Sequence, residues 1–260
     1  MKRYPVQFVG AGPGDPELVT VKGKRLLQEA DRVVYAGSLV PAALLDHCRP
    51  ETERFDSASL TLEQTHDLLA RGHEDGLRVV RLHTGDPALY GAIQEQMELL
   101  DKASIPYRVT PGVTAVFAAA AELRQELTLP EVSQTVILTR LGGRTPVPPR
   151  ENLASLASHG ATLAIYLSVH DMEGVVEELG RGYEAETPVV VAYRVGWPDQ
   201  TLVKGTLADI VQKVRRTDIR RQAIILVGPV LQAREKGNVK PSRLYDASFS
   251  HGFRHARSDS

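Results

Sequence analysis

Hydrophobic and polar positions follow two different periods along the chain. Short runs of β-branched and other apolar residues alternate with longer stretches whose apolar positions recur every three or four residues. The runs indicate buried β-strands and the longer stretches indicate amphipathic helices. In the first half the strand runs are residues 6–9, 32–35, 77–82 and 107–109, and the helical stretches are 21–30, 61–71 and 92–103. This alternation predicts a parallel α/β sheet.

The second half repeats the pattern less regularly. Its strand runs are residues 135–138, 162–166, 188–192 and 223–227, and residues 201–203 follow the turn Gly196-Trp197-Pro198-Asp199 like the return arm of a hairpin. We therefore predict a mixed sheet here and an α/β fold of two domains. The expected limits are 1–116 for the N-terminal domain, 117–240 for the C-terminal domain and 241–260 for a C-terminal tail.

Composition narrows the class of protein. The 260 residues are 42% hydrophobic and 24% charged, which is the usage of an ordinary globular protein. Lys and Arg number 31 against 32 Asp and Glu, so no global field favours nucleic acid or an anionic membrane. No apolar run reaches the roughly 20 residues that span a bilayer. The single Cys48 excludes an internal disulfide and suits a reducing compartment, so we expect a cytoplasmic protein.

A glycine-rich segment follows the first predicted strand, with the sequence Gly10-Ala11-Gly12-Pro13-Gly14-Asp15. A dinucleotide-binding fingerprint needs a third glycine where Asp15 stands and an acid at the end of the second strand, where Ala36 stands. Pro13 also lacks the N–H that would face a pyrophosphate. An NAD(P) oxidoreductase is therefore disfavoured, whereas a glycine turn without any ligand stays an alternative.

Two further loops follow later strands of the predicted parallel sheet. Their sequences are Thr84-Gly85-Asp86-Pro87-Ala88-Leu89-Tyr90-Gly91 and Pro111-Gly112-Val113-Thr114-Ala115. In open α/β sheets, ligands bind at the carboxyl ends of the strands, where these loops lie. Asp86 is suited either to cap a helix or to contact a ligand, and both roles stay open.

In their order and spacing, these three loops resemble those of the tetrapyrrole methyltransferases that act on uroporphyrinogen and the precorrins. The resemblance extends over nearly the whole chain. It implies a two-domain α/β fold with S-adenosylmethionine in the cleft between the domains, a corrin precursor as substrate, and a homodimer.

Two segments resemble one branch of that family, which methylates precorrin-4 at carbon 11. They are Tyr35-Ala36-Gly37-Ser38-Leu39-Val40-Pro41 and the tail from Leu244 to Arg254. The uroporphyrinogen branch carries Asp in place of Ala36 and a Lys after the third strand, where Phe55-Asp56-Ser57-Ala58 contains none.

The resemblance also implies site residues. Cofactor contacts are expected from Pro13, Thr84, Gly85, Asp86, Leu89, Thr114, Ala115, Leu167 and Val195, the last two from the second domain. Leu167 stands where the family often has Met. Arg140, Arg194 and Arg254 are the expected partners of the substrate carboxylates.

No catalytic acid or base and no metal site is assigned from the sequence. Transfer of a methyl group from a sulfonium needs two reactants to be aligned and needs no covalent enzyme intermediate. Of the eight histidines only His251 and His255 share a helical spacing, and no carboxylate or Cys completes a metal site near them. The tail is expected to pack near the macrocycle. The alternatives are methylation at another position of a precorrin or uroporphyrinogen, and a non-catalytic tetrapyrrole-binding protein.

Overall fold

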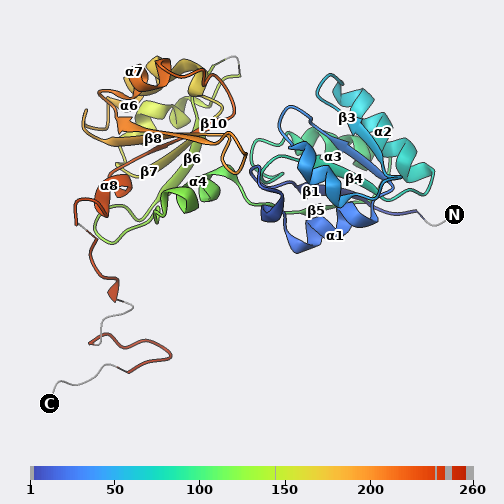
Figure 1. The fold of residues 1–260 in the computed structure, drawn as a ribbon, viewed down its shortest axis with the longest axis horizontal. Helices are drawn as coiled ribbons and strands as arrows, with labels where there is room; N and C mark the ends of the chain where they lie inside the picture. The colour runs from blue at the N-terminus through green and yellow to red at the C-terminus, as the bar shows by residue number, and fades with distance from the viewer. Residues whose placement is uncertain (1–2, 144, 238, 244–247, 256–260) are drawn as a thin grey trace. The chain divides into compact units, whose positions relative to one another are not determined.

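The computed structural model describes residues 3–143, 145–237, 239–243 and 248–255. The chain divides into two compact units (Figure 1). Unit 1 contains the described residues up to Ala119 together with Arg194–Thr201, and unit 2 contains Ala120–Tyr193 and the described residues from Leu202 onward. The segment Arg194–Thr201 thus packs with unit 1 although the chain on both sides of it belongs to unit 2.

Unit 1 is built on a parallel sheet, as the sequence predicted, and its five strands have the order β3-β2-β4-β1-β5, of which β3 was not among the predicted runs. The strands are β1 (Val6–Gly10), β2 (Arg32–Tyr35), β3 (Glu53–Asp56), β4 (Val79–His83) and β5 (Tyr107–Thr110). In the register of the central strands, Gly10 pairs with His83 and Val9 with Thr110. The loops that follow β1, β4 and β5 therefore leave the sheet side by side.

Helices cover both faces of this sheet and bury its apolar side chains. Helices α2 (Leu62–Glu74) and α3 (Ile93–Lys102) pack on the face that carries Phe8 and Val79. Helix α1 (Val21–Glu29) and the 3-10 turn η2 (Ala42–His47) pack on the face that carries Val9 and Leu82. A second 3-10 turn, η1 (Pro16–Leu18), precedes α1, and α4 (Ala115–Leu123) follows β5.

Unit 2 contains a mixed five-stranded sheet, again as predicted, with the order β6-β7-β10-β8-β9. Its strands are β6 (Val136–Arg140), β7 (Thr162–Tyr166), β8 (Pro188–Tyr193), β9 (Thr201–Thr206) and β10 (Ala223–Val227). β6 and β7 are parallel, and β10 is antiparallel to both β7 and β8. β6, β7 and β8 consequently run in one direction.

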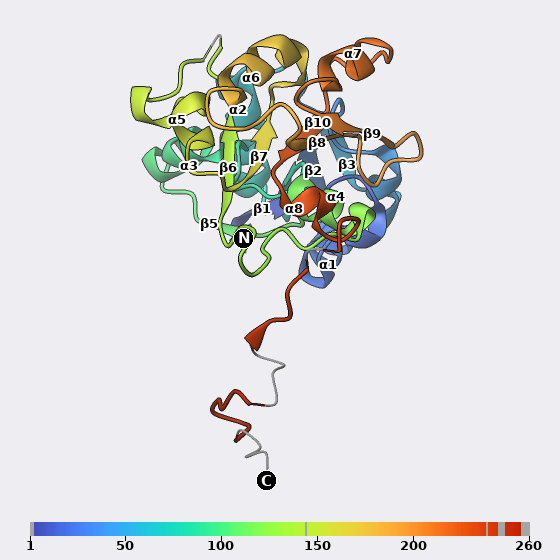
Figure 2. The same cartoon turned by 90° about the vertical axis from the view of Figure 1, so that its left-hand side faces the viewer.

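The helices of unit 2 divide between the two faces of its sheet. Figure 2 shows α5 (Leu153–Ala157), α6 (Met172–Leu179) and α7 (Ile210–Arg215) along one side, where they enclose the larger core. Helix α8 (Val230–Ala233) lies on the other side against Leu129. The short turns η3 (Pro149–Glu151) and η4 (Val169–Asp171) precede α5 and α6. Among the described residues, no helix is long and apolar enough to cross a bilayer.

Two buried basic side chains, Arg81 and His83, lie on one face of β4. Arg81 donates to Gln96 Oε1 at 3.0 Å and to Ser57 Oγ at 2.8 Å, and burial lowers its pKa to about 10. Burial, together with the positive charge of Arg81, lowers the pKa of His83 to about 3. His83 is therefore a neutral imidazole at physiological pH, next to the ring of Phe8 at 5.8 Å between ring centroids.

This buried histidine makes stability depend on pH. An unfolded chain protonates a histidine near pH 6.5, whereas folded His83 stays neutral down to about pH 3. Between these values the unfolded state binds more protons, so the free energy of unfolding should fall as pH falls, by up to about 1.4 kcal/mol per pH unit for this group. Urea unfolding between about pH 7 and pH 4.5 measures the slope. His83→Gln should flatten it and His170→Gln, which removes an exposed histidine, should not; equal slopes in all three proteins would contradict this account.

Candidate functional site

Three loops of unit 1 meet at glycines: the first loop (residues 10–15), the second loop (residues 84–91) and the third loop (residues 111–115). Gly12 and Gly85 exchange two backbone hydrogen bonds, of 3.3 Å and 2.8 Å. A Cβ atom on Gly10 would lie 2.6 Å from the Cα of Gly112 and 2.7 Å from the carbonyl oxygen of Gly85. Only glycine lets the three backbones approach this closely.

Gly85 differs from Gly10 and Gly112 because a Cβ atom at this position would meet no other backbone closely. Its φ is +59°, and the nearest atom to a Cβ at this position would be the Cα of Thr114, 3.8 Å away. Thr84 beside it is exposed, Leu89 is half-buried, and Pro13 and Thr114 are buried. The backbone of the second loop is therefore accessible to a ligand. This fits the binding of the methyl donor, S-adenosylmethionine, that the resemblance implies.

Asp86 ties the second loop to the third. One carboxylate oxygen accepts a hydrogen bond from the N–H of Ala88 at 2.8 Å, and the other accepts from the N–H of Gly112 at 2.9 Å. The N-cap residue of α3 is Ala92. Of the two roles left open for Asp86, the helix cap is therefore wrong, because its carboxylate stabilises its own turn and holds the neighbouring loop.

The turn between β8 and β9 packs on the first loop, within unit 1. The indole Nε1 of Trp197 donates to the carbonyl oxygen of Pro13 at 3.2 Å, and a Cβ on Gly14 would collide with the indole. Val195 is 4% exposed, and its carbonyl oxygen also lies against Gly14. Trp197 was not among the predicted site residues, although it is the single tryptophan of the chain and stands in a turn sequence.

The segment after β2 is held by an acid from β3. The carboxylate of Asp56 accepts hydrogen bonds from the N–H groups of Gly37 at 2.8 Å and Ala58 at 2.9 Å. These bonds hold the pKa of Asp56 below its usual value. The turn from Tyr35 to Pro41, which carries the resemblance to one branch of the family, is thereby fixed next to the end of β3.

In unit 2, two predicted residues lie at the carboxyl ends of co-directional strands. Arg140 is the last residue of β6 and Leu167 directly follows β7. Leu167 is 65% exposed and has a φ of +55°, a conformation that costs energy for a residue with a side chain. Strained backbone recurs at binding sites, and the side chain of Leu167 is accessible to a ligand.

Each of the three predicted substrate-binding arginines already contacts protein acceptors. Arg140 donates to the carbonyl oxygens of Thr145 and Pro146, both at 2.8 Å, and so holds the loop after β6. Arg194 forms an ion pair with Asp199 at 2.6 Å. Arg254 donates to the carbonyl oxygen of Phe249 at 3.5 Å. Their contacts with a substrate stay predictions.

The described part of the tail forms a tight turn. His251 and Arg254 exchange backbone hydrogen bonds of 2.8 Å and 3.0 Å, and the side chain of Phe253 is fully exposed. Residues 244–247 and 256–260 of the predicted tail lie outside the described residues.

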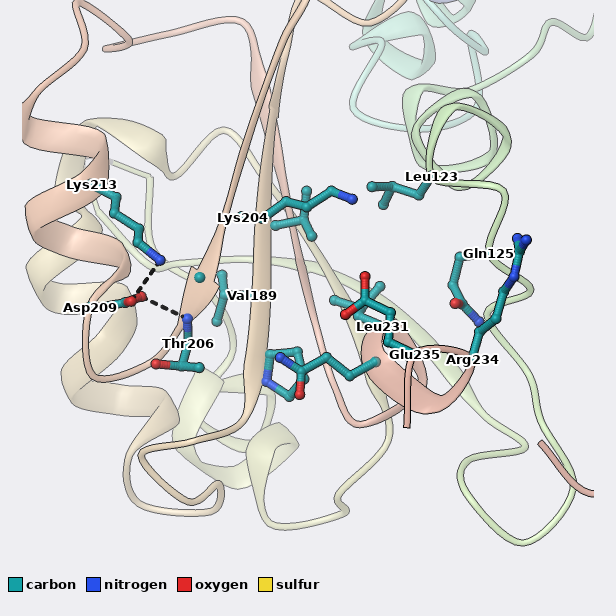
Figure 3. A pocket seen from close by; sticks show the side chains of 14 residues that line it. Leu123, Gln125, Val189, Lys204, Thr206, Asp209, Lys213, Leu231, Arg234 and Glu235 are labelled. Atoms are coloured by element: carbon teal, nitrogen blue, oxygen red, sulfur yellow. Dashed lines mark hydrogen bonds and ion pairs between the residues drawn. The ribbon is translucent and has the colours of Figure 1, made fainter. Parts of the chain in front are cut away.

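A separate cavity of about 570 Å³ opens in unit 2 between β8, β9 and α8 (Figure 3). Within it Lys213 and Asp209 pair with each other at 2.6 Å, and Lys204, Arg234 and Glu235 are exposed side chains at its rim. It contains none of the predicted site residues, and we assign it no ligand. Within the described ranges, no group of three or more His, Cys, Asp or Glu side chains is placed to hold a metal ion.

Comparison with known proteins gives one consistent result. Residues 5–211 match the family model of the Tetrapyrrole (Corrin/Porphyrin) Methylases. The chain is 50% identical to the cobalt-precorrin-4 C(11)-methyltransferase of Methanocaldococcus jannaschii over 96% of this chain and 95% of that one. It is 52% identical to the precorrin-4 C(11)-methyltransferase of Pseudomonas aeruginosa over 96% of this chain and 98% of that one.

Solved structures agree with the sequences. The X-ray structure of a cobalamin biosynthetic enzyme, cobalt precorrin-4 methyltransferase, superposes with a TM-score of 0.85 at 48% identity, covering 87% of this chain and 95% of that one. Uroporphyrin-III C-methyl transferase from Thermus thermophilus, complexed with S-adenyl homocysteine, gives a TM-score of 0.74 at 28% identity, covering 88% and 94%.

The two-sheet α/β fold and the three joined glycine loops define the class of a tetrapyrrole methyltransferase. The chain belongs to the Tetrapyrrole (Corrin/Porphyrin) Methylase family.

Asp86 offers a direct test of how the loops are held together. Asp86→Ala removes the acceptor for two backbone N–H groups and should lower the free energy of unfolding by about 2 kcal/mol. Asp86→Asn keeps one acceptor oxygen and should lose about half as much. Urea unfolding measures both changes, with the exposed Asp218→Ala as the control. Equal stability of the Asp86→Ala and Asp218→Ala proteins would show that the carboxylate does not hold the third loop.

Proposed function

We propose that this protein transfers a methyl group from S-adenosylmethionine to carbon 11 of precorrin-4 or cobalt-precorrin-4. The observation that carries the proposal is the near-full-length identity, 50% and 52%, with two proteins named for that reaction. The joined glycine loops support it, because they leave the backbone at Gly85 open to a ligand.

The proposed donor site follows the residues carried over from the family. S-adenosylmethionine supplies a methyl group on a sulfonium, which is its own leaving group. The proposed contacts are Pro13, Thr84, Gly85, Asp86, Leu89, Thr114, Ala115, Leu167 and Val195. Within this set, Asp86 acts through its hydrogen bonds to Ala88 and Gly112, which fix the loop whose backbone meets the donor.

The proposed chemistry is an in-line displacement. The bond from sulfur to methyl breaks as the bond from methyl to the ring carbon forms, and the macrocycle releases one proton when that carbon becomes quaternary. The protein's part is to hold the two reacting atoms aligned at about 3 to 3.5 Å. The glycine contacts and Asp86 link the loops to one another, which favours such alignment.

Substrate recognition completes the proposal. A corrin precursor carries several carboxylates, and Arg140, Arg194 and Arg254 are the proposed guanidinium partners. The homodimer and the cytoplasmic location belong to the same proposal and rest on the family resemblance and on the single Cys48.

The regiochemistry of transfer tests the function. Precorrin-4 and its cobalt form are incubated separately with S-adenosylmethionine that carries a ¹³C-labelled methyl group. One label should enter carbon 11, and uroporphyrinogen should take up none, because the turn after β2 has Ala36 where the uroporphyrinogen branch has Asp. Carbon NMR identifies the position. Label at another ring carbon would refute the assigned position, and no transfer at all together with tetrapyrrole binding would favour the non-catalytic alternative.

The open side of Gly85 predicts a selective effect on donor affinity. Gly85→Ala places a methyl group where the donor approaches and should weaken S-adenosylhomocysteine binding at least tenfold, about 1.4 kcal/mol. Calorimetry measures the affinity, and NADH serves as the ligand that should not bind. Gly160→Ala is the matched control, because Gly160 has nearly the same φ of +61° and no atom within 4 Å of the added Cβ.

Both alanine variants carry the same backbone strain, so their melting temperatures should fall equally. Unchanged affinity in Gly85→Ala would remove the second loop from the donor site.

A further inference from the structure

The indole of Trp197 contacts the first loop and stacks against the guanidinium of Arg194. The guanidinium carbon of Arg194 lies 4.0 Å from the centre of the indole ring, and the same guanidinium pairs with Asp199 at 2.6 Å. The turn is also closed internally, since the N–H of Gly196 donates to Gln200 Oε1 at 2.7 Å. A stacked cation and an ion pair fix the plane of the indole.

The first loop and the indole are joined by several contacts, which would break if the loop moved away. The carbonyl oxygen of Pro13 accepts from Trp197 Nε1 at 3.2 Å, and Gly14 is the residue whose missing side chain makes space for the ring. A Cβ on Gly196 would lie 2.7 Å from the N atom of Asp15, so the two backbones also touch directly. All these residues belong to unit 1.

Hydrogen bonds also connect the first loop to the second loop and the second loop to the third. Gly12 and Gly85 exchange backbone hydrogen bonds, and Asp86 holds Gly112. A displacement of the first loop therefore changes the position of Gly85, which is the open backbone of the second loop.

We propose that Trp197, clamped by the guanidinium of Arg194, which Asp199 holds in place, is a positioning residue that sets the affinity of the site for S-adenosylmethionine by fixing the first loop. The proposal rests on the donor site of the proposed function. Trp197 acts through Pro13 and Gly14 and needs no contact with either substrate. Its removal should act on donor binding, whereas the chemistry after both substrates are bound should be affected far less.

Three variants separate positioning from general stabilisation. Trp197→Ala removes the ring and should weaken S-adenosylhomocysteine binding about tenfold. Trp197→Phe keeps a ring against Gly14 but cannot donate to Pro13, so it should lose about threefold, the net value of one hydrogen bond. Tyr4→Ala is the matched control, because it removes another aromatic ring of unit 1 that lies under an arginine, Arg78. Tyr4 lies at the amino end of β1, whereas the three loops lie at the carboxyl ends of the strands.

Steady-state kinetics distinguish positioning from stabilisation, because a loss of stability alone does not change the KM for S-adenosylmethionine. In Trp197→Phe and Trp197→Ala the KM for S-adenosylmethionine should rise by these factors, while kcat changes less than about twofold. Tyr4→Ala should leave both values unchanged even where its melting temperature falls. A fall in melting temperature for the Trp197 variants without a change in S-adenosylhomocysteine affinity would overturn the proposal.

The intact protein provides a second test. The chain contains one tryptophan, so tryptophan emission, excited where tyrosine does not absorb, reports on Trp197 alone. Titration with S-adenosylhomocysteine should change the emission with the same midpoint as the calorimetric signal. Heat of binding without any change in emission would count against a link between the indole and the donor site. If the wild-type protein gave no heat of binding, the proposed donor itself would be wrong, whereas wild-type binding with unaffected variants would refute the clamp alone.

Discussion

The close approach of three backbones at Gly10, Gly85 and Gly112 is the constraint on which the site depends. The strand order brings the ends of β4, β1 and β5 together, but neighbouring strands ordinarily leave room for side chains between their loops. Here a Cβ on Gly10 or Gly112 would collide with the backbone of another loop. Glycine at these positions therefore converts three separate loops into one connected structure, and Gly85 keeps its open side for a ligand.

Side chains around the site hold this backbone in place. The carboxylate of Asp86 binds two N–H groups, Asp56 does the same for the turn after β2, and Trp197 covers Gly14. None of these arrangements resembles a nucleophile with its base. They suit a methyl transfer from a sulfonium, in which placement of the reactants matters more than proton transfer to a particular side chain.

The second unit supplies a different kind of edge. β6 and β7 run in the same direction, so Arg140 and the strained, exposed Leu167 come from the carboxyl ends of neighbouring strands. Arg140 donates to the carbonyl oxygens of Thr145 and Pro146 in the loop that follows it. An arginine found by its charge in the sequence can thus have a structural task in addition to any contact with a substrate.

The sequence by itself determined how most strands and helices alternate, and it determined the family. Strands β7 and β10 lie at the residues predicted from their apolar runs, and the parallel and mixed sheets follow from how strands and helices alternate. The three glycine loops were recognisable because each lies within a few residues along the chain. Tertiary structure decided the rest. Asp86 and Gly112 are 26 positions apart and Trp197 and Pro13 are 184 apart, so no local pattern could show that they meet. The packing of Arg194–Thr201 with unit 1, while β8 and β9 on either side pair in unit 2, likewise depends on contacts that form only when the chain is folded.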